Sequence, residues 1–255
     1  MRKTFASILA LCALAAATMT SCKKDDTLIY GNVNMGNIDG ESIISDNGNT
    51  FDIVEAPFAI DLSTFEYGRV ILSCDVLKHT GDARYDIRLT AISSVLTKPA
   101  VKKSTITDPE SELAVEDAIV IKEMWYGGGY LNMLIEFAQK KGSQTKHFIN
   151  LVHDDTVEGE GYTFILRHNA YGEVPDKDKN ESYSSSLCYV SFPIAGMIEG
   201  DQADLTIKWK SHKLLDNGMY SPYEHEDMTE ECKWKRTGYE HKNTTLKSKT
   251  TVYVR

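Results

Sequence analysis

A cluster of candidate metal ligands lies late in the chain, in the segment 223–232, which holds His225, Cys232 and five acidic residues. Imidazole, thiolate and carboxylate groups all bind divalent metals, but structural zinc sites use paired cysteines or histidines at short spacing. The segment contains no such pair. A charge-rich solvated loop is therefore the favoured interpretation, and neither a metal nor any other cofactor is predicted.

The same predicted loop carries two tyrosines, Tyr220 and Tyr223, next to His225. Aromatic rings with a polar tip stack on sugars and anchor protein partners at interfaces. Tyr220, Tyr223 and His225 therefore form a candidate ligand-contact loop.

Three histidines, His147, His153 and His168, invite comparison with a catalytic triad because Asp154 and Asp155 lie close by in the sequence. Many serine hydrolases place their nucleophile in a Gly-x-Ser-x-Gly turn, and the chain has no such motif. His147 and His168 lie in strand-like segments and are interpreted as hydrogen-bonded structural residues. No catalytic residue is predicted, and the chain is interpreted as not being an enzyme.

Two further motifs resemble ligand-binding loops. The glycine triplet at residues 127–129 could cradle a phosphate, but a phosphate loop needs a following helix, and an alternating strand follows instead. The triplet is better explained as a hairpin turn that needs positive φ angles. The segment 176–187 begins like a calcium loop, but Glu181 and Leu187 stand where an EF-hand needs glycine and glutamate. A solvated acidic loop is favoured there, and a looser calcium site is the alternative.

The N-terminus predicts export and lipid attachment. Arg2 and Lys3 precede an apolar run over residues 5–17, as in a secretory signal peptide. The run is shorter than the roughly 20 apolar residues that cross a bilayer. Residues 19–22, Met-Thr-Ser-Cys, resemble the bacterial lipobox, in which the cysteine is acylated. Residues 1–21 are therefore interpreted as a signal peptide and Cys22 as the lipidated first residue, with an ordinary signal peptide and a chance cysteine as the alternative.

The residues after this cysteine favour a position at the outer membrane. Residues 23–26, Lys-Lys-Asp-Asp, look like the surface-export signal of Bacteroidota lipoproteins. We expect an outer-membrane lipoprotein exposed on the cell surface, with a periplasm-facing position as the alternative. Two Asp-Thr-apolar segments, at Thr27 and Thr156, resemble acceptors of O-glycosylation in the same bacteria.

Net charge excludes two classes of partner. Removal of residues 1–21 takes away two basic and no acidic residues, so the formal net charge changes from −9 to −11. Binding of nucleic acid through its phosphates needs a basic footprint, and so does electrostatic binding to anionic lipid. We therefore expect no nucleic acid as a partner, and a membrane contact only through the lipid at Cys22.

Three cysteines remain for redox chemistry once Cys12 and Cys22 are set aside. Cys74 alternates with apolar residues at positions 70, 72 and 76, which predicts a buried thiol on a strand. A disulfide between Cys188 and Cys232 is chemically allowed in an oxidising envelope, and two free thiols are the alternative.

Short alternating runs, separated by clusters of glycine, asparagine, aspartate and serine, predict an all-β chain. Residues 69–77, 85–92 and 130–138 are clear examples. In the third run, Leu131, Met133, Ile135 and Phe137 face inward, whereas Asn132 and Glu136 face outward.

A domain boundary is predicted near residue 113, after the acidic segment 107–112 with its proline. About five strands in residues 30–112 fit an OB-like barrel. About seven strands in residues 113–255 fit a β-sandwich of two packed sheets. Residues 22–29 are assigned to the lipidated tether.

Several motifs resemble the NigD-like family of Bacteroidota lipoproteins. In the second half they are residues 125–132 (WYGGGYLN), 147–152 (HFINLV) and 166–172 (LRHNAYG), and in the first half 68–70 (GRV) and 95–98 (VLTK). The resemblance covers nearly all of the chain after Cys22 and implies an OB-like domain followed by a β-sandwich, in agreement with the strand pattern. The family takes its name from a gene cluster linked to a bacteriocin, and no catalytic residues are assigned in it.

The favoured function is a non-enzymatic binding or interaction module whose partner is an envelope protein, a peptide toxin or a glycan. Bacteriocin immunity or self-protection is what the name of the family implies. One alternative is an envelope hydrolase that acts on glycans, which would need two facing carboxyl groups. The other is a structural subunit of a surface assembly, which would need a large exposed apolar patch.

Overall fold

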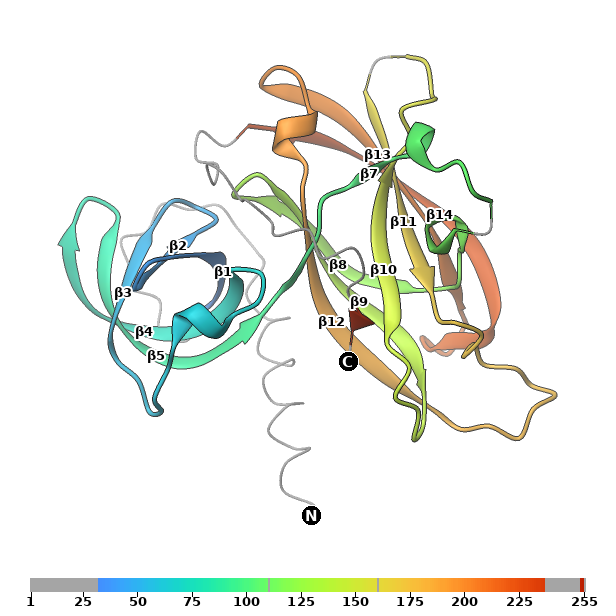
Figure 1. Cartoon of the computed structure of the whole chain (residues 1–255), viewed down its shortest axis with the longest axis horizontal. Coiled ribbons are helices and arrows are strands. Elements are labelled where there is room, and N and C mark those ends of the chain that lie inside the picture. Colours follow the sequence, from blue (N-terminus) through green and yellow to red (C-terminus); the bar gives the residue numbers. More distant parts are fainter. Residues whose placement is uncertain (1–31, 110, 160, 237–252, 255) are drawn as a thin grey trace.

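The computed structural model describes residues 32–109, 111–159, 161–236 and 253–254, and strands dominate it (Figure 1). A small barrel lies beside a larger sandwich of two sheets. The predicted fold class is confirmed: the chain is all-β, with a five-stranded barrel followed by a β-sandwich. Within the described ranges, no helix is long and apolar enough to cross a membrane.

Five strands form the barrel: β1 (Asn32–Asp39), β2 (Ser42–Ser45), β3 (Thr50–Glu55), β4 (Arg69–Gly81) and β5 (Arg84–Ser94). They close in the order β1-β2-β3-β5-β4, so each strand has a hydrogen-bonded neighbour on both sides. The β3–β5 pair is parallel, and the other pairs are antiparallel. Alternate side chains point inward and form a small apolar core that includes Phe51, Leu72 and Leu89.

Cys74 belongs to this core and is 3 % exposed, which confirms the predicted buried thiol. Burial raises the pKa of this thiol to about 11. Because the thiolate is the reactive form, the thiol of Cys74 is inert at neutral pH.

The sandwich contains two sheets. Its strands are β6 (Leu96–Thr97), β7 (Val101–Lys102), β8 (Val120–Gly127), β9 (Tyr130–Lys140), β10 (His147–His153), β11 (Tyr162–Asn169), β12 (Tyr183–Pro193), β13 (Gln202–Leu214), β14 (Tyr220–Lys235) and β15 (Tyr253–Val254). One sheet has the order β6-β12-β9-β8. The other has the order β14-β13-β11-β10-β15, with β7 also paired to β10.

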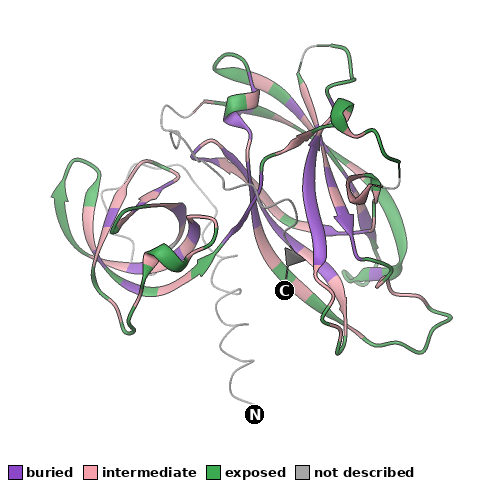
Figure 2. Cartoon of the chain, in the orientation of Figure 1, coloured by how far each residue is buried: buried purple, intermediate pink, exposed green. Residues whose placement is uncertain are grey.

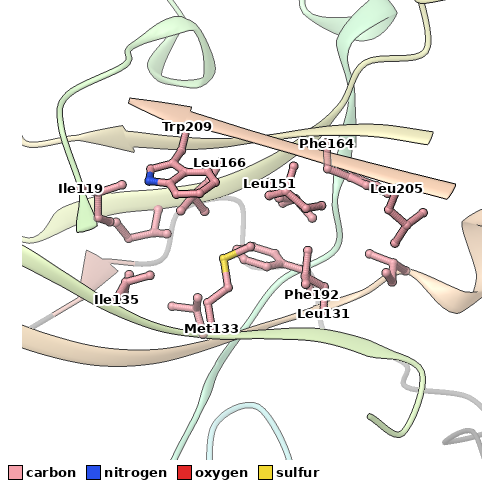
Figure 3. Close-up of a cluster of buried hydrophobic side chains, with 14 of the residues drawn as sticks. Ile119, Leu131, Met133, Ile135, Leu151, Phe164, Leu166, Phe192, Leu205 and Trp209 are labelled. Carbon is pink, nitrogen blue, oxygen red and sulfur yellow. The ribbon is translucent and has the colours of Figure 1, made fainter. Parts of the chain in front are cut away.

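The core of the sandwich lies between the inner faces of these two sheets (Figure 3). Leu131, Met133 and Ile135 of β9 face Leu151, Phe164 and Leu166 of the other sheet across this core, as Figure 3 shows. All of these side chains are at most 2 % exposed. The predicted inward face of residues 130–138 is therefore confirmed.

Two short strands connect the barrel to the sandwich. β6 pairs with β12, and β7 pairs with β10, so residues 96–102 hydrogen-bond to both sheets of the sandwich. A division near residue 113 assigns this segment to the barrel instead. Strands of two residues carry no alternation that a sequence pattern could reveal. We therefore propose a boundary close to Val95, the last residue before β6.

The segment 223–232 is not a loop, because it lies within the long strand β14. β14 pairs antiparallel with β13 and forms one edge of its sheet. The solvated character of the segment was predicted correctly, since its acidic residues are all exposed (Figure 2). Charged side chains are common on edge strands, where they oppose pairing with another chain.

A buried arginine joins the two domains. Arg69 begins β4 and is 0 % exposed. Its Nε donates to Ser191 Oγ of β12 at 2.9 Å, and its Nη2 donates to Asn132 Oδ1 of β9 at 2.8 Å. Within the barrel, Nη1 donates to Asn37 Oδ1 at 3.0 Å, and the two terminal nitrogens bind the Asp46 carboxylate at 2.8 and 2.7 Å. All five N–H groups of the guanidinium are therefore used.

The glycine hairpin between β8 and β9 packs against the same junction. The guanidinium of Arg69 lies over the ring of Tyr130, 3.8 Å from its centre. Gly128 donates its backbone N–H to the carbonyl of Asp46 at 3.1 Å, and a Cβ at Gly127 would stand 3.0 Å from the Asp46 side chain. Gly128 and Gly129 have φ angles of 58° and 91°, which confirms the predicted hairpin turn.

Candidate binding site at the β13–β14 hairpin

The hairpin between β13 and β14 extends beyond the paired body of its sheet. Leu214 pairs with Tyr220 next to the turn, and His212 pairs with His225, with a register shift between His212 and Leu214. Backbone bonds from Gly218 N to Leu215 O and from Leu215 N to Met219 O close the turn at 2.9 and 2.8 Å. Gly218 has a φ angle of 77°, a conformation that favours glycine.

Apolar side chains gather at the end of this hairpin. Leu214, Met219, Tyr220 and Tyr223 are 53, 62, 36 and 51 % exposed, and together we call them the apolar tip. They are four of the ten large exposed hydrophobic residues in the described part of the chain. Single exposed apolar residues are ordinary, but a group of them marks an interaction surface.

A cleft of about 190 Å³ lies next to the apolar tip. Strands of both sheets line it: Val120 of β8, residues 136–138 of β9, residues 183–185 of β12, His212 of β13, and residues 220–222 of β14, together with Pro175. The cleft therefore lies where the start of β14 approaches the four-stranded sheet.

Most polar groups in the cleft already have partners. Glu136 forms an ion pair with Lys122 at 3.1 Å and accepts a hydrogen bond from Ser185 Oγ. Ser221 Oγ accepts bonds from two backbone N–H groups, those of Tyr223 and Glu224, at 3.3 and 3.1 Å. These groups are therefore engaged before any ligand arrives.

His212 is the exception in this cleft. It is 8 % exposed, and no hydrogen-bond partner is present for its Nδ1 among the described residues. The ring of His225 lies edge-on to it, with the ring centres 5.1 Å apart. Burial, and then the neighbouring His225, lower the pKa of His212, which favours the neutral imidazole, whereas a hydrogen bond with the backbone of Ser221 acts in the opposite direction. A neutral imidazole offers one donor and one acceptor nitrogen.

A row of acidic residues follows the apolar tip along β14. We call Glu224, Glu226, Asp227, Glu230 and Glu231 the acidic strip; all five are exposed. Glu224 forms an ion pair with Lys213 at 3.2 Å. The other four form no ion pair with any described residue, so their charge is available to a partner.

The structure places the three residues of the predicted ligand-contact loop near one another, on a strand. Tyr220 lines the cleft, Tyr223 belongs to the apolar tip, and His225 contacts His212. Sequence reasoning did not single out His212 or Met219. The one available signal was the apolar pair at residues 214–215 beside a glycine turn.

The modification sites predicted from sequence lie elsewhere. Cys22 and Thr27 lie outside the described residues. Thr156 is exposed in the turn after β10, and its hydroxyl donates to Asp154 Oδ1 at 2.6 Å.

Two of the three histidines, His147 and His168, contact each other inside the sandwich. His147 Nδ1 and His168 Nε2 lie 2.9 Å apart, and His168 Nδ1 lies 3.1 Å from the Ala118 carbonyl oxygen. Both rings are buried, which confirms the prediction of hydrogen-bonded structural histidines. Burial lowers the pKa of His168 to about 3. Asp154 instead pairs with Lys103 at 2.7 Å.

Two clefts formed by described residues each contain a single carboxyl group. The hairpin cleft is lined by one acid, Glu136. A second cleft, between residues 161–162, 202–204 and 233–234, is also lined by one acid, Asp204, which pairs with Lys233 at 3.0 Å. Glycosidases need two carboxyl groups on opposite sides of the bond that they cleave. No group of three or more metal-ligating side chains occurs among the described residues.

Cys188 and Cys232 have free thiols and lie on different sheets. The sulfur of Cys232 lies 2.7 Å from the hydroxyl of Tyr126. Burial raises the pKa of the Cys188 thiol to about 12. These two thiols are therefore protonated at neutral pH.

Comparison with solved structures identifies several proteins of similar fold. A toxin-related protein from Parabacteroides distasonis is 20 % identical, with a TM-score of 0.55 over 80 % of this chain and 93 % of its own. A NigD-like immunity protein from Bacteroides caccae is 20 % identical, with a TM-score of 0.52 over 77 % and 93 %. A lipoprotein from Bacteroides fragilis is 13 % identical, with a TM-score of 0.55 over 81 % and 99 %. At these identities the likeness shows the fold.

A search of curated protein sequences found no significant relative. Residues 102–218 match the family model of the NigD-like C-terminal beta sandwich domain. The matched region runs from the end of β7 to the turn of the β13–β14 hairpin. The predicted resemblance is therefore confirmed: most of the second domain is similar to the NigD-like C-terminal β-sandwich domain.

Proposed function

We propose that this chain is a non-enzymatic binding module of the cell envelope that captures a polypeptide partner at the β13–β14 hairpin. The observation that carries the proposal is the apolar tip, which stands next to a cleft and to the acidic strip. Protein interfaces combine an apolar centre, rich in aromatic residues, with a polar rim. The hairpin has both parts.

The names of similar structures favour a toxin as the partner. One is an immunity protein and another is a toxin-related protein. Capture of a polypeptide toxin would need a surface that complements its charge. The single, ion-paired carboxyl group in each of the two clefts described above also favours binding over glycan hydrolysis there.

The proposal includes anchoring by lipid at Cys22 in the outer membrane, with the folded domains on the cell surface. The lipobox-like residues 19–22 and the following Lys-Lys-Asp-Asp support it. Acyl chains contribute about 0.8 kcal/mol for each buried CH₂ group, so several chains make the attachment permanent. Labelling with radioactive palmitate should mark the wild type and leave Cys22→Ala unmarked. Protease treatment of intact cells should then remove the domains; protection of the domains would place them on the periplasmic side.

Site-specific photocrosslinking in intact cells tests the binding function. A photoreactive amino acid at position 223, in the apolar tip, should yield a covalent adduct with one identified polypeptide. The matched control places the same amino acid at position 77, where Leu77 is exposed on the barrel. Met219→Ser should weaken binding of the purified partner at least tenfold, as expected for a residue at the centre of an interface. Adducts that are equal at positions 223 and 77 would refute a hairpin interface.

A further inference from the structure

We infer that the hairpin cleft is an anchor pocket for one tyrosine or tryptophan side chain of a basic polypeptide partner. The inference rests on the proposed function and names the chemistry of the partner. Four observations support the inference. They are the size of the cleft, the existing hydrogen bonds of its polar groups, the buried imidazole of His212, and the negative charge of the adjacent strand.

The size of the cleft suits one aromatic side chain. Clefts for drug-sized ligands enclose roughly 300 Å³ or more, whereas this one encloses about 190 Å³. A buried apolar cavity of about 150 Å³ holds a benzene ring. The cleft therefore has room for a phenol or indole ring.

The lining favours an apolar body over a sugar ring. Pro175 and Pro222 line the cleft together with the buried residues Val120 and Phe137. The carboxylate of Glu136 and the hydroxyl of Ser221 are held by protein partners. A sugar would bring several hydroxyl groups into a site with few free partners, and each buried unsatisfied hydroxyl costs about 1–3 kcal/mol.

His212 favours a ligand side chain that carries one hydrogen-bonding group on an otherwise apolar ring. Its Nδ1 is buried and lacks a partner among the described residues. Tyrosine and tryptophan each carry one donor at the edge of an apolar ring, and both are enriched at the energetic centres of interfaces. If the imidazole turns its Nδ1 toward the cleft when the ring enters, Nδ1 can accept the phenol O–H or the indole N–H. Phenylalanine would fill the same space and leave Nδ1 unpaired.

The acidic strip favours positively charged residues on either side of the inserted tyrosine or tryptophan of the partner. Four of its five carboxylates have no ion pair with described residues, and the strip begins two residues after the cleft-lining Pro222. Lysine and arginine residues beside the inserted ring would lie against these carboxylates. Charge complementarity of this kind raises the rate of association and disfavours acidic partners.

Capped tripeptides test the inference with defined probes. The protein is the chain from residue 22 to 255 with Cys22→Ser, and binding is followed by ¹H–¹⁵N NMR titration. Lys-Trp-Lys and Lys-Tyr-Lys should bind at least about tenfold more tightly than Lys-Ala-Lys, and about three- to tenfold more tightly than Lys-Phe-Lys. The shifted resonances should belong to residues 136–138, 183–185 and 212. Equal affinities, or shifts elsewhere, would overturn the inference.

The preference for basic flanking residues is tested with the tripeptide Glu-Trp-Glu. It should bind to the protein more weakly than Lys-Trp-Lys at about 0.01 M salt. The difference should shrink at about 0.15 M, because salt screens exposed charges. The double variant Glu226→Gln, Asp227→Asn should reduce the same difference. A difference unaffected by salt and by this variant would refute the basic flank.

A pocket-filling variant separates this inference from the function on which it rests. Ala138 lines the cleft, and Ala138→Phe places a ring inside it. Ala114→Phe, at an exposed position in the 3₁₀ turn Glu112–Ala114, is the control for an added ring. Ala138→Phe alone should abolish tripeptide binding, with an unchanged far-ultraviolet circular dichroism spectrum. If the partner captured at position 223 binds Ala138→Phe as tightly as wild type, the pocket inference fails and the hairpin interface stands. If position 223 captures nothing, the proposed function fails.

Discussion

Removal of the Arg69 guanidinium should destabilise the protein more than removal of any exposed arginine. The Arg69→Met variant keeps most of the length of the side chain and loses all five hydrogen bonds and the contact with the Tyr130 ring. It leaves the carboxylate of Asp46 and the amide of Asn132 without their main partner. Breaking a buried ion pair by removing one member costs about 3–5 kcal/mol.

The structure points to the lower end of this range. The side chain of Asp46 is 14 % exposed, so water can solvate its carboxylate when the guanidinium is gone. Ser191 and Asn132 keep the hydrogen bond between their side chains, at 2.6 Å. We therefore expect a loss of about 3 kcal/mol in the free energy of unfolding.

Urea denaturation, followed by tryptophan fluorescence and circular dichroism, measures this loss. Arg84→Met is the matched control, because Arg84 also binds a carboxylate through two nitrogens, that of Asp52 at 2.6 Å, but is 52 % exposed. Exposed pairs contribute about 0–1 kcal/mol. Arg69→Lys should recover part of the loss, since an ammonium group cannot reproduce the planar fork.

Two outcomes carry separate information. If the junction couples the domains, the Arg69→Met transition should split into two, one for the barrel and one for the sandwich, because cooperative unfolding requires strong interdomain contacts. A cost below about 1 kcal/mol, equal to that of Arg84→Met, would refute the assignment of Arg69 as the residue that joins the domains.

Three further predictions concern single groups. His168 is neutral in the folded state and gains a proton on unfolding when the pH is below its ordinary pKa of 6.5. The free energy of unfolding should therefore decrease as the pH falls from 6.5 to about 3, by up to about 1.4 kcal/mol per pH unit. In urea titrations at several pH values, His168→Gln should lack this contribution to the pH dependence. Gly36→Ala should cost about 1–3 kcal/mol in thermal or urea unfolding, because its Cβ would clash with the Ile44 carbonyl oxygen; an unchanged midpoint would contradict this. Iodoacetamide at pH 8 should leave Cys74 unmodified in the native protein and alkylate it in urea, as read by mass spectrometry.

Much of the fold follows from local patterns in the sequence. The alternation of apolar residues over 69–77, 85–92 and 130–138 correctly identifies β4, β5 and β9, because one face of each strand lies in a core. The glycine triplet correctly identifies the β8–β9 hairpin. These features depend on neighbours in the chain, so a sequence pattern contains them.

Features that depend on distant residues were harder to predict. The segment 223–232 shows no apolar alternation because most of its side chains are exposed, so the sequence predicts a loop there. Its pairing with β13 makes it a strand. Asn132 does face outward from β9, yet it is 0 % exposed because the barrel covers that face. Arg69 shows no local sign that it will be buried, since its partners are 23 to 122 positions away.

The three residues of the predicted ligand-contact loop, Tyr220, Tyr223 and His225, lie on one strand because they are neighbours in the sequence. The cleft beside them was not predictable, since it requires β8, β9 and β12 to lie against the start of β14. His212 gained its significance only from pairing with His225 across two strands.

The negative charges along β14 also affect how copies of this protein interact when they are crowded together on a membrane. Lipoproteins held in one leaflet, as proposed for this chain, move in two dimensions and collide far more often than the same molecules in solution. An uncharged edge strand on each copy would invite neighbouring copies to join into continuous ribbons. Five carboxylates on one edge make two such edges repel each other, so the molecules remain separate at high density while the same edge still attracts a basic ligand.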